Sequence, residues 1–263
     1  MLALITGQGG LPARVASTLE QAPLVCALDG FAPEMLAVDI TFRIEHLGTL
    51  IAELKDRDVR EVCFCGAIKR PQVDPTQLDA ATLPLVPVIM QALGSGDDGA
   101  LRAVMAVFEQ QGFRIRAAHE IAPDILAPQG VLSRATPTPA MESDVARADA
   151  VLQALSPLDV GQGCVVGAGQ VWGVETIGGT DHMLRHLPTG VAQAGAIFVK
   201  APKTGQDKRA DMPTIGPDTI QAAADAGLVG VVICAGNVIL LEPEETIQRA
   251  NDAAIVLWSR APV

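Results

Sequence analysis

The chain of 263 residues is 49% hydrophobic and 19% charged, so it can bury the cores of two α/β domains of ordinary size. Its formal net charge of −11 argues against a nucleic-acid polymer as partner, because phosphate backbones are held by basic surfaces. An anionic ligand would have to be small and bound locally.

The N-terminal stretch MLALITGQGG carries no basic residue, and its apolar run is too short for a signal peptide. The longest apolar runs begin at Leu83 and Leu228. Proline, or glycine and asparagine, interrupts them, and both are shorter than the ~20 residues that cross a bilayer. We therefore expect a cytoplasmic protein without a transmembrane segment.

Apolar runs of strand length alternate with helical patterns along the first half of the chain. The expected strands are LALIT, LVCALD, EVCFCGA and FRIRAAHEI, and the expected helices are Pro12–Glu20, His46–Asp56 and the run from Gly99 to Gly112. This alternation is typical of βαβ units with a parallel sheet. It predicts a Rossmann-like N-terminal domain.

A glycine-rich turn follows the first expected strand. Gly7 and Gly9 fill two positions of a dinucleotide-binding fingerprint, but Pro12 takes the position of the third glycine. Proline fits the first turn of a helix, where its missing N–H is not needed. The turn favours an anion-binding site at a helix start, with a plain strand-to-helix turn as the alternative.

Asp29 ends the second expected strand, where such folds place a ribose-binding acid. Together with Gly7 and Gly9 it supports an alternative function as a nicotinamide-dependent oxidoreductase. Pro12 counts against that alternative.

The cysteines are odd in number and lie in apolar runs, which indicates reduced, buried thiols rather than disulfides. They are Cys26, Cys63, Cys65, Cys164 and Cys234. The four histidines form no metal-binding spacing with them, so zinc is not expected.

Asp97 and Asp98 stand in GSGDDGAL, at the expected start of a helix. N-capping is the common role of an acid at such a position. The stretch is not a P-loop, because no Gly-Lys-Ser/Thr follows.

The segment from Ala122 to Met141 contains four prolines and no helical or alternating periodicity. We expect an N-terminal domain at 1–130, a linker at 131–141 and a second α/β domain at 142–263. The second domain is expected to contain the helix Glu142–Leu155, strands within CVVGAGQVWGVET, AIFVKA, VGVVIC, NVILLE and AIVLW, and helices that begin at Pro217 and Pro243.

In GGTDHMLRH, Thr180 and Asp181 are candidate helix caps, and Asp181 lies four residues before Arg185 on one helix face. His182 and His186 share this spacing, but the residues between them are not those of a zinc protease.

The loop KAPKTGQDKRADMPTIG gathers cations beside carboxylates. It holds Lys200, Lys203, Lys208 and Arg209 together with Asp207 and Asp211. Such a loop could bind a phosphate and a divalent metal together, or form a salt-bridged surface. Asp225 stands in the last turn of the next expected helix, where a carboxylate opposes the helix dipole by ~0.3–1 kcal/mol.

The motifs GQGGLP, GDDGAL, GGTDHMLRH and KTGQDKRADMPTIGPDTI together resemble the LpxI family of UDP-2,3-diacylglucosamine pyrophosphatases over nearly the whole chain. One departure is Gly178 with Gly179, where the family motif begins with a glutamate. The resemblance implies a cytoplasmic, Mg²⁺-dependent enzyme of lipid A synthesis that directs water at the β phosphorus. It also implies that the substrate is held in a ligand cleft between the two domains. The products would be UMP and 2,3-diacylglucosamine 1-phosphate (lipid X). It gives Asp225 the role of the essential acid, either orienting water or binding the metal.

The substrate-binding residues that we expect are Gln8, Gly9, Gly10, Lys69, Asp97, Asp98, Thr180, Asp181, Lys203, Gln206, Asp207, Arg209 and Asp211. The metal ligands are left open. The expected partner is a lipid-linked UDP-sugar, with transient contact to the inner membrane surface and a homodimer as further expectations. A non-catalytic sugar-nucleotide sensor is the other alternative.

Overall fold

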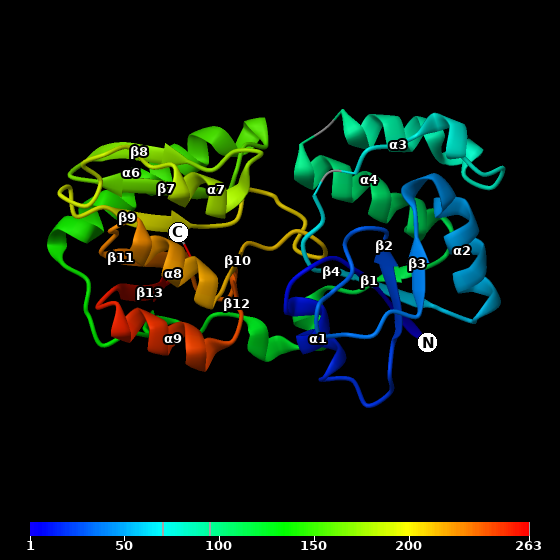
Figure 1. The fold of residues 1–263 in the computed structure, drawn as a ribbon, viewed down its shortest axis with the longest axis horizontal. Helices are drawn as coiled ribbons and strands as arrows, with labels where there is room; N and C mark the ends of the chain where they lie inside the picture. Colours follow the sequence, from blue (N-terminus) through cyan, green and yellow to red (C-terminus); the bar gives the residue numbers. More distant parts are fainter. Residues whose placement is uncertain (70, 95, 263) are drawn as a thin grey trace. The chain divides into compact units, whose positions relative to one another are not determined.

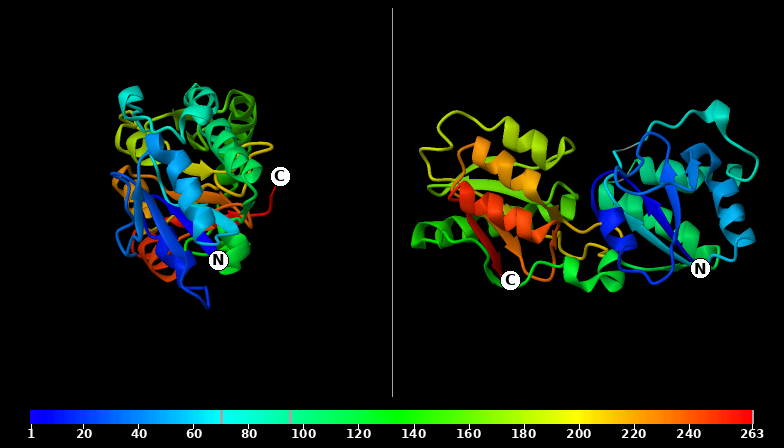
Figure 2. Two further views of the ribbon diagram at one scale, coloured as in Figure 1. Left: turned by 90° about the vertical axis from the view of Figure 1, so that its right-hand side faces the viewer. Right: turned by 60° about the horizontal axis from the view of Figure 1, so that its bottom comes forward.

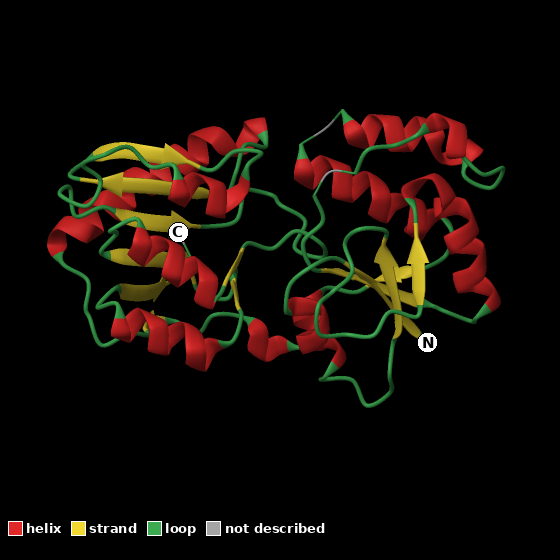
Figure 3. Ribbon diagram, viewed as in Figure 1, coloured by secondary structure: helices red, strands yellow, loops and turns green. Residues whose placement is uncertain are grey.

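The computed structural model describes residues 1–69, 71–94 and 96–262, with the side chains of Leu93 and Asp97 left out (Figure 1). The chain forms two compact units. Unit 1 comprises Met1–Pro123 and Asp207–Asp211, and unit 2 comprises Asp124–Gln206 and the chain from Met212 onward. Strands and helices alternate in both units (Figure 3), which confirms the predicted α/β class with two domains.

Unit 1 is built on a five-stranded, fully parallel sheet in the order β3-β2-β1-β4-β5. Its strands are β1 (Leu2–Thr6), β2 (Leu24–Leu28), β3 (Ile40–Phe42), β4 (Glu61–Cys65) and β5 (Arg114–Ile115). This arrangement confirms the expected parallel, Rossmann-like sheet.

The helices of unit 1 bury one apolar face against this sheet. They are α1 (Leu11–Ala16), α2 (Leu47–Asp56), α3 (Val86–Leu93), α4 (Asp97–Gln110) and α5 (Ala118–Ile121), with 3₁₀ turns at Ile44–His46, Pro75–Gln77 and Leu83–Leu85. Leu50 and Leu54 of α2 and Phe108 of α4 form one buried cluster with Phe64 of the sheet. Leu50 and Leu54 are four residues apart, which places them on the same side of α2.

Two expected elements of unit 1 are shorter than predicted. Helix α1 ends at Ala16, and the hydroxyl of Ser17 donates to the carbonyl oxygen of Arg14 over 2.7 Å. After Ile115 the expected strand gives way to α5, because Glu120 accepts from the backbone N–H of Ala117 at 3.3 Å and closes a helical turn.

Unit 2 contains a six-stranded mixed sheet in the order β6-β13-β11-β9-β7-β8. Its strands are β6 (Gly130–Val131), β7 (Gly163–Gly167), β8 (Gln170–Val174), β9 (Ile197–Lys200), β11 (Gly230–Cys234) and β13 (Val256–Arg260), and β10 (Thr214–Ile215) pairs separately with β12 (Ile239–Leu240). Strands β9, β11 and β13 are parallel, and β7 runs antiparallel to β9.

Helices cover both faces of this sheet. They are α6 (Pro139–Leu155), α7 (Gly179–Arg185), α8 (Pro217–Asp225) and α9 (Pro243–Asp252), with a 3₁₀ turn at Ser156–Leu158. Met141 and Val145 of α6 pack on Val199, whereas Leu184 of α7 and Ile220 of α8 share a core with residues of the opposite face. Figure 2 shows α8 and α9 side by side on that face.

The two units change over at Pro123, before the predicted linker at 131–141. Within that predicted linker, Val131 pairs with Trp258 of β13, and Thr138 caps α6 by accepting from the N–H of Met141 at 3.3 Å. The sequence pattern gave no sign that Asp207–Asp211, late in the chain, would belong to unit 1.

Within the described residues, no helix combines the length and the apolar character that a membrane span requires.

Candidate functional site

The carboxyl ends of the parallel strands of unit 1 meet at one edge of the sheet, which is where α/β folds bind ligands. The glycine turn after β1 and the loop after β4 are joined there. Gln8 and Ala67 exchange two backbone hydrogen bonds of 2.9 Å. The predicted binding residues Gln8, Gly9 and Gly10 and the loop that carries Lys69 therefore lie at the same edge.

The two glycines of the predicted fingerprint have different roles. A Cβ atom on Gly7 would lie 2.4 Å from the carbonyl oxygen of Ala67, so the contact between the two loops requires glycine. Gly9 has a φ of +91°, and a Cβ there would meet no non-neighbouring atom within 4 Å. Helix α1 has six residues and Pro12 is its second, so an anion at this turn would depend on the open backbone around Gly9.

Asp29 lies directly after β2 and is exposed. It lines a pocket of about 370 Å³ together with Ile40, Thr41, Phe42, Arg43, His46, Thr49, Leu50 and Glu53. No residue of the glycine turn is among them. This pocket thus brings Asp29 together with residues of β3 and α2, and not with the glycine turn.

An ion network fixes the segment Asp207–Asp211 to α4 in unit 1. The backbone N–H of Asp207 donates to Asp98 Oδ1 over 3.0 Å, and Arg102 Nε donates to Asp98 Oδ2 over 2.7 Å. Arg209 Nη2 lies 2.7 Å from Asp207 Oδ2, and its Nη1 lies 2.5 Å from Glu109 Oε1. Asp98 therefore anchors the motif segment instead of capping α4.

Pairing with Arg209 keeps the carboxyl group of Asp207 ionised. The hydrogen bonds from Arg209 lower the pKa of Asp207, although burial acts in the opposite direction. The side chain of Asp207 is 14% exposed. Asp207 is thus an anion held by an arginine at neutral pH. Asp97 is the first residue of α4, but its side chain lies outside the described residues.

In unit 2, the predicted residue Thr180 is joined to the end of β9. Lys200 Nζ donates to Thr180 Oγ1 over 2.8 Å. Lys200 ends the apolar strand AIFVK and is buried, with 8% exposure. The sequence placed Lys200 in a charged loop and not among the binding residues; the signal that it differs is the unbroken apolar run before it.

Lys203 and Gln206 follow at the same end of the sheet. Lys203 Nζ forms an ion pair with Asp159, and its backbone N–H donates to Gln206 Oε1 over 2.9 Å. Gln206 is buried. These two residues of the motif belong to unit 2, and Asp207, Arg209 and Asp211 belong to unit 1.

The start of α7 differs from the prediction. Gly178 stands at its N-cap, and neither Thr180 nor Asp181 caps it. Arg185 Nε donates to the backbone oxygen of Asp181 over 3.0 Å, so the expected side-chain pair of these residues does not form. Asp181 is exposed.

Asp225 is the last residue of α8 and is exposed. Its Oδ1 accepts a hydrogen bond of 2.9 Å from Gln221 Nε2, one turn earlier. Asp252 ends α9 in the same way, with Gln248 Nε2 at 2.8 Å. Because such Gln–Asp pairs stabilise a helix by ~0.2–0.5 kcal/mol, they offset an acid at a C-terminus. The unusual position of Asp225 thus has a structural explanation.

Asp225 and Lys200 lie at opposite ends of the unit 2 sheet. Helix α8 leads into the amino end of β11 at Gly230, which pairs with Ile197, whereas Ile233 near the other end pairs with Lys200. Three residues of strand span ~10 Å. The structure therefore does not bring Asp225 together with the other predicted site residues of this unit.

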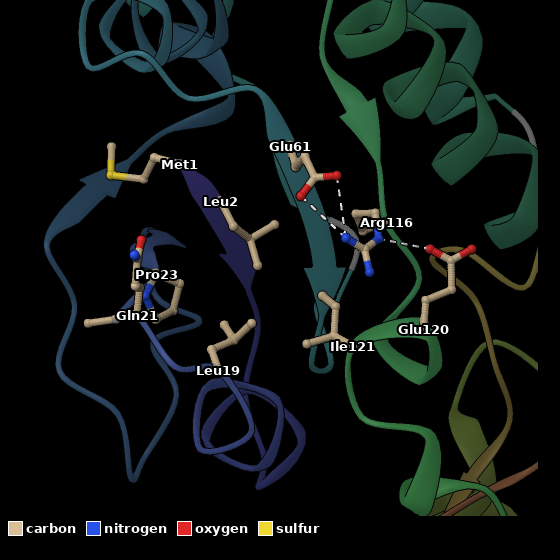
Figure 4. Close-up of a pocket in the computed structure, with 10 residues that line it drawn as sticks. Met1, Leu2, Leu19, Gln21, Pro23, Glu61, Arg116, Glu120 and Ile121 are labelled. Carbon is tan, nitrogen blue, oxygen red and sulfur yellow. Dashed lines mark hydrogen bonds and ion pairs between the residues drawn. The ribbon is translucent and has the colours of Figure 1, made fainter.

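A further pocket, of about 290 Å³, lies in unit 1 beside the amino ends of the strands (Figure 4). Leu2 and Ile121 are among its lining residues. Arg116 bridges Glu61 at 3.3 Å and Glu120 at 3.0 Å on its rim. This pocket lies at the sheet edge opposite the glycine turn, and its charged residues are paired with one another. It contains none of the predicted binding residues.

The described residues contain no group of three or more histidine, cysteine or acidic side chains that could hold a metal ion. A Mg²⁺ ion needs no such group when substrate phosphates supply ligands, since one or two carboxylates then suffice. Asp98 and Asp207 are two carboxylate residues joined by a hydrogen bond, since the backbone N–H of Asp207 donates to Asp98 Oδ1.

Two comparisons relate the chain to known proteins. Residues 1–125 match the model of the LpxI N-terminal domain, and residues 128–258 match that of the LpxI C-terminal domain. A protein of Caulobacter vibrioides, named UDP-2,3-diacylglucosamine pyrophosphatase LpxI, is 37% identical over 275 residues, which covers 99% of this chain and 98% of the relative.

Proposed function

The chain belongs to the LpxI family, and on that premise we propose that it hydrolyses the pyrophosphate bond of UDP-2,3-diacylglucosamine to UMP and 2,3-diacylglucosamine 1-phosphate. The observation that carries the proposal is the 37% identity, along almost the full length of both chains, to a relative named for this activity. Water attacks the β phosphorus, the bond to the bridging oxygen breaks, and UMP leaves.

The proposed phosphate-binding groups come from the motif segment and the strand ends. Lys203 and Gln206 follow β9 in unit 2. In unit 1, Arg209 is held by the carboxylates of Asp207 and of Glu109 on α4. The backbone around Gly9 and the side chain of Lys69 add donors at the edge of unit 1. Fixed donors of this kind stabilise the charge that develops on a phosphoryl group at little reorganisation cost.

We assign the acid of the reaction to the motif segment. The segment carries two carboxylates. Asp207 accepts from Arg209 with both of its oxygens, and the backbone N–H of Asp211 donates to the backbone oxygen of Asp207 over 3.3 Å. We propose that Asp211 orients the attacking water or binds Mg²⁺. The placement of Asp225 gives no support to the role that the family resemblance implies for it, so we do not retain it as catalytic.

Mg²⁺ is part of the proposal. One or two carboxylates among Asp98, Asp207 and Asp211 would hold it together with the substrate phosphates. The ion would supply positive charge to the phosphoryl oxygens and to the departing UMP.

The test is incubation of the purified chain with UDP-2,3-diacylglucosamine and Mg²⁺, followed by detection of UMP and the diacylated sugar phosphate. Release of both products in equal amounts is expected, and chelation of Mg²⁺ should stop it. Binding of the UDP-sugar without release of UMP would favour the sugar-nucleotide sensor over the enzyme. Binding of NAD(H) with hydride transfer would favour the oxidoreductase alternative.

Because the proposed substrate carries two acyl chains, we also propose that the protein acts at the cytoplasmic surface of the inner membrane through transient contact. Co-sedimentation with lipid vesicles containing the substrate, and not with vesicles lacking it, is the expected result. Light scattering during gel filtration tests the expected homodimer.

A further inference from the structure

Lys200 is a buried cation without a carboxylate partner in the part of the chain that the structure describes. It is 8% exposed. Its Nζ atom has three donors, and one of them is used by Thr180 Oγ1 at 2.8 Å. The other two donors have no protein acceptor among the described residues. Lysine is rarely buried in this way unless it is paired.

Other shielded cations of unit 2 are paired with carboxylates. Lys203, with 8% of its side chain exposed, pairs with Asp159, and Arg260, with 11%, pairs with Asp149. Removing an ammonium from water costs several kcal/mol unless an opposite charge compensates. Lys200 therefore departs from the pattern of its own unit, and a ligand that brings negative charge would remove the imbalance.

The carboxylate of Glu175 lies on the same face of the sheet as Lys200. A Cβ atom on Gly163, the register partner of Lys200, would lie 2.6 Å from Glu175 Oε2 and 2.6 Å from a ring carbon of Phe198. Glu175 is thus on the sheet face that Lys200 shares with Phe198, two residues earlier. No ion pair joins Glu175 and Lys200, and Glu175 Oε2 is buried without a hydrogen-bond partner among the described residues.

The position of Lys200 also fits a ligand site. It is the last residue of a central parallel strand, and the chain leaves the sheet with Ala201 and Pro202 toward Lys203. The ammonium lies at the carboxyl end of β9, the end at which parallel strands of α/β units present their binding groups.

We propose that Lys200, with the hydroxyl of Thr180, forms an anion subsite at the carboxyl end of β9 that binds a phosphate group. Resting on the proposed function, we assign this subsite to the pyrophosphate of the UDP-sugar. The ammonium donates its two remaining hydrogens to phosphoryl oxygens, and Thr180 directs it toward them. Lys200 is thus a binding residue of the reaction that the motif pattern did not identify.

The subsite is tested by binding of inorganic pyrophosphate, measured calorimetrically with the full chain. Lys200→Met keeps the length and the apolar stem of the side chain and removes the charge. Affinity should fall about 10- to 100-fold, as expected for a charge-assisted hydrogen bond, while the melting temperature without ligand stays equal or rises. Lys55→Met is the matched control, because the Lys55 ammonium also donates to a neutral side-chain oxygen, that of Gln111 at 2.7 Å.

A second measurement uses the unaltered protein, so it does not depend on folding of the variant. Pyrophosphate should slow reductive methylation of Lys200, followed by mass spectrometry, at least threefold and leave Lys55 unchanged. Equal pyrophosphate affinity of Lys200→Met and wild type, no pyrophosphate binding by the wild type, or absence of protection would each overturn the proposal.

These outcomes are distinct from failure of the proposed function. If the wild type binds pyrophosphate through Lys200 but releases no UMP from UDP-2,3-diacylglucosamine, the anion subsite is supported and the proposed enzymatic function is refuted. A wild type that hydrolyses this substrate as fast after Lys200→Met as before would retain the enzyme and overturn the assignment of Lys200.

Discussion

Replacement of Asp225 by asparagine should leave hydrolysis of UDP-2,3-diacylglucosamine almost unchanged. Asp225 is separated from the carboxyl end of β9 by about the length of the strand, ~10 Å. A unit charge at that distance, across a surface exposed to water, contributes ~0.4 kcal/mol. That energy corresponds to about a twofold change in rate. The melting temperature should stay equal or rise, because a charge that opposes the helix dipole is removed.

Asp211→Asn is the contrasting change. A carboxylate that orients water or holds Mg²⁺ at the reacting phosphorus contributes ~10²- to 10⁴-fold to the rate. The assay is release of UMP with Mg²⁺ in excess and substrate dispersed in detergent. Asp252→Asn serves as the matched control for Asp225→Asn, since both acids end a helix and accept from a glutamine one turn earlier.

A fall of 100-fold or more in Asp225→Asn, with an unchanged melting temperature and an active Asp252→Asn, would refute this reasoning. It would restore Asp225 as the essential acid and require the substrate to reach the amino end of β11. Full activity of Asp211→Asn would separately remove the proposed acid from the motif segment.

Three other measurements follow from the structure. Gly7→Ala should lower the free energy of unfolding by roughly 1–3 kcal/mol, because its Cβ atom would press on backbone atoms. Gly9→Ala should lower it by only ~1 kcal/mol, from its positive φ alone. Equal melting temperatures for the two variants would contradict the loop contact. Because Arg209 lowers the pKa of folded Asp207, the stability gained from this pair is complete above the unfolded pKa near ~4 and is lost as the pH falls through the lower folded value. The difference in melting temperature between wild type and Asp207→Asn should therefore shrink between pH 5 and pH 3, and a constant difference would exclude the pair as its cause. All five cysteines are buried, and burial raises the pKa of Cys26 to about 12 and that of Cys164 to about 11. A disulfide reagent at pH 8 should therefore label no cysteine of the native protein and five after unfolding.

The parallel sheet of unit 1 and most helices could be predicted because their apolar spacing is local. The runs LALIT and EVCFC have the length of buried strands, and the cluster Leu47–Leu54 has helical spacing. Periodicity failed where a few hydrogen bonds decide the backbone, as at Glu120, which turns the expected strand after Ile115 into a short helix.

The candidate site could be predicted only in part. The motif makes Lys203, Gln206, Asp207 and Arg209 candidates, but composition cannot tell that two of them would belong to one unit and two to the other. The sequence does not predict Lys200 as a binding residue, because its burial depends on tertiary packing and not on the apolar strand that it ends. Asp225 is a candidate from the sequence because its carboxylate opposes the helix dipole. The hydrogen bond from Gln221 that compensates this charge is a feature of the folded helix.

The presence of Asp207–Asp211 in unit 1 bears on how the protein can be dissected. A fragment that stops at Pro123 would lack a piece of its own unit: Ala210 would no longer cover the core, and Glu109 would lose its arginine. The complementary fragment would carry the same five residues with nothing to hold them. Truncation after Pro123 therefore yields two incomplete fragments. When the two fragments are mixed, the contacts of Asp207–Asp211 with unit 1 can form again, so fragment complementation can be measured through recovery of the Arg209–Glu109 ion pair.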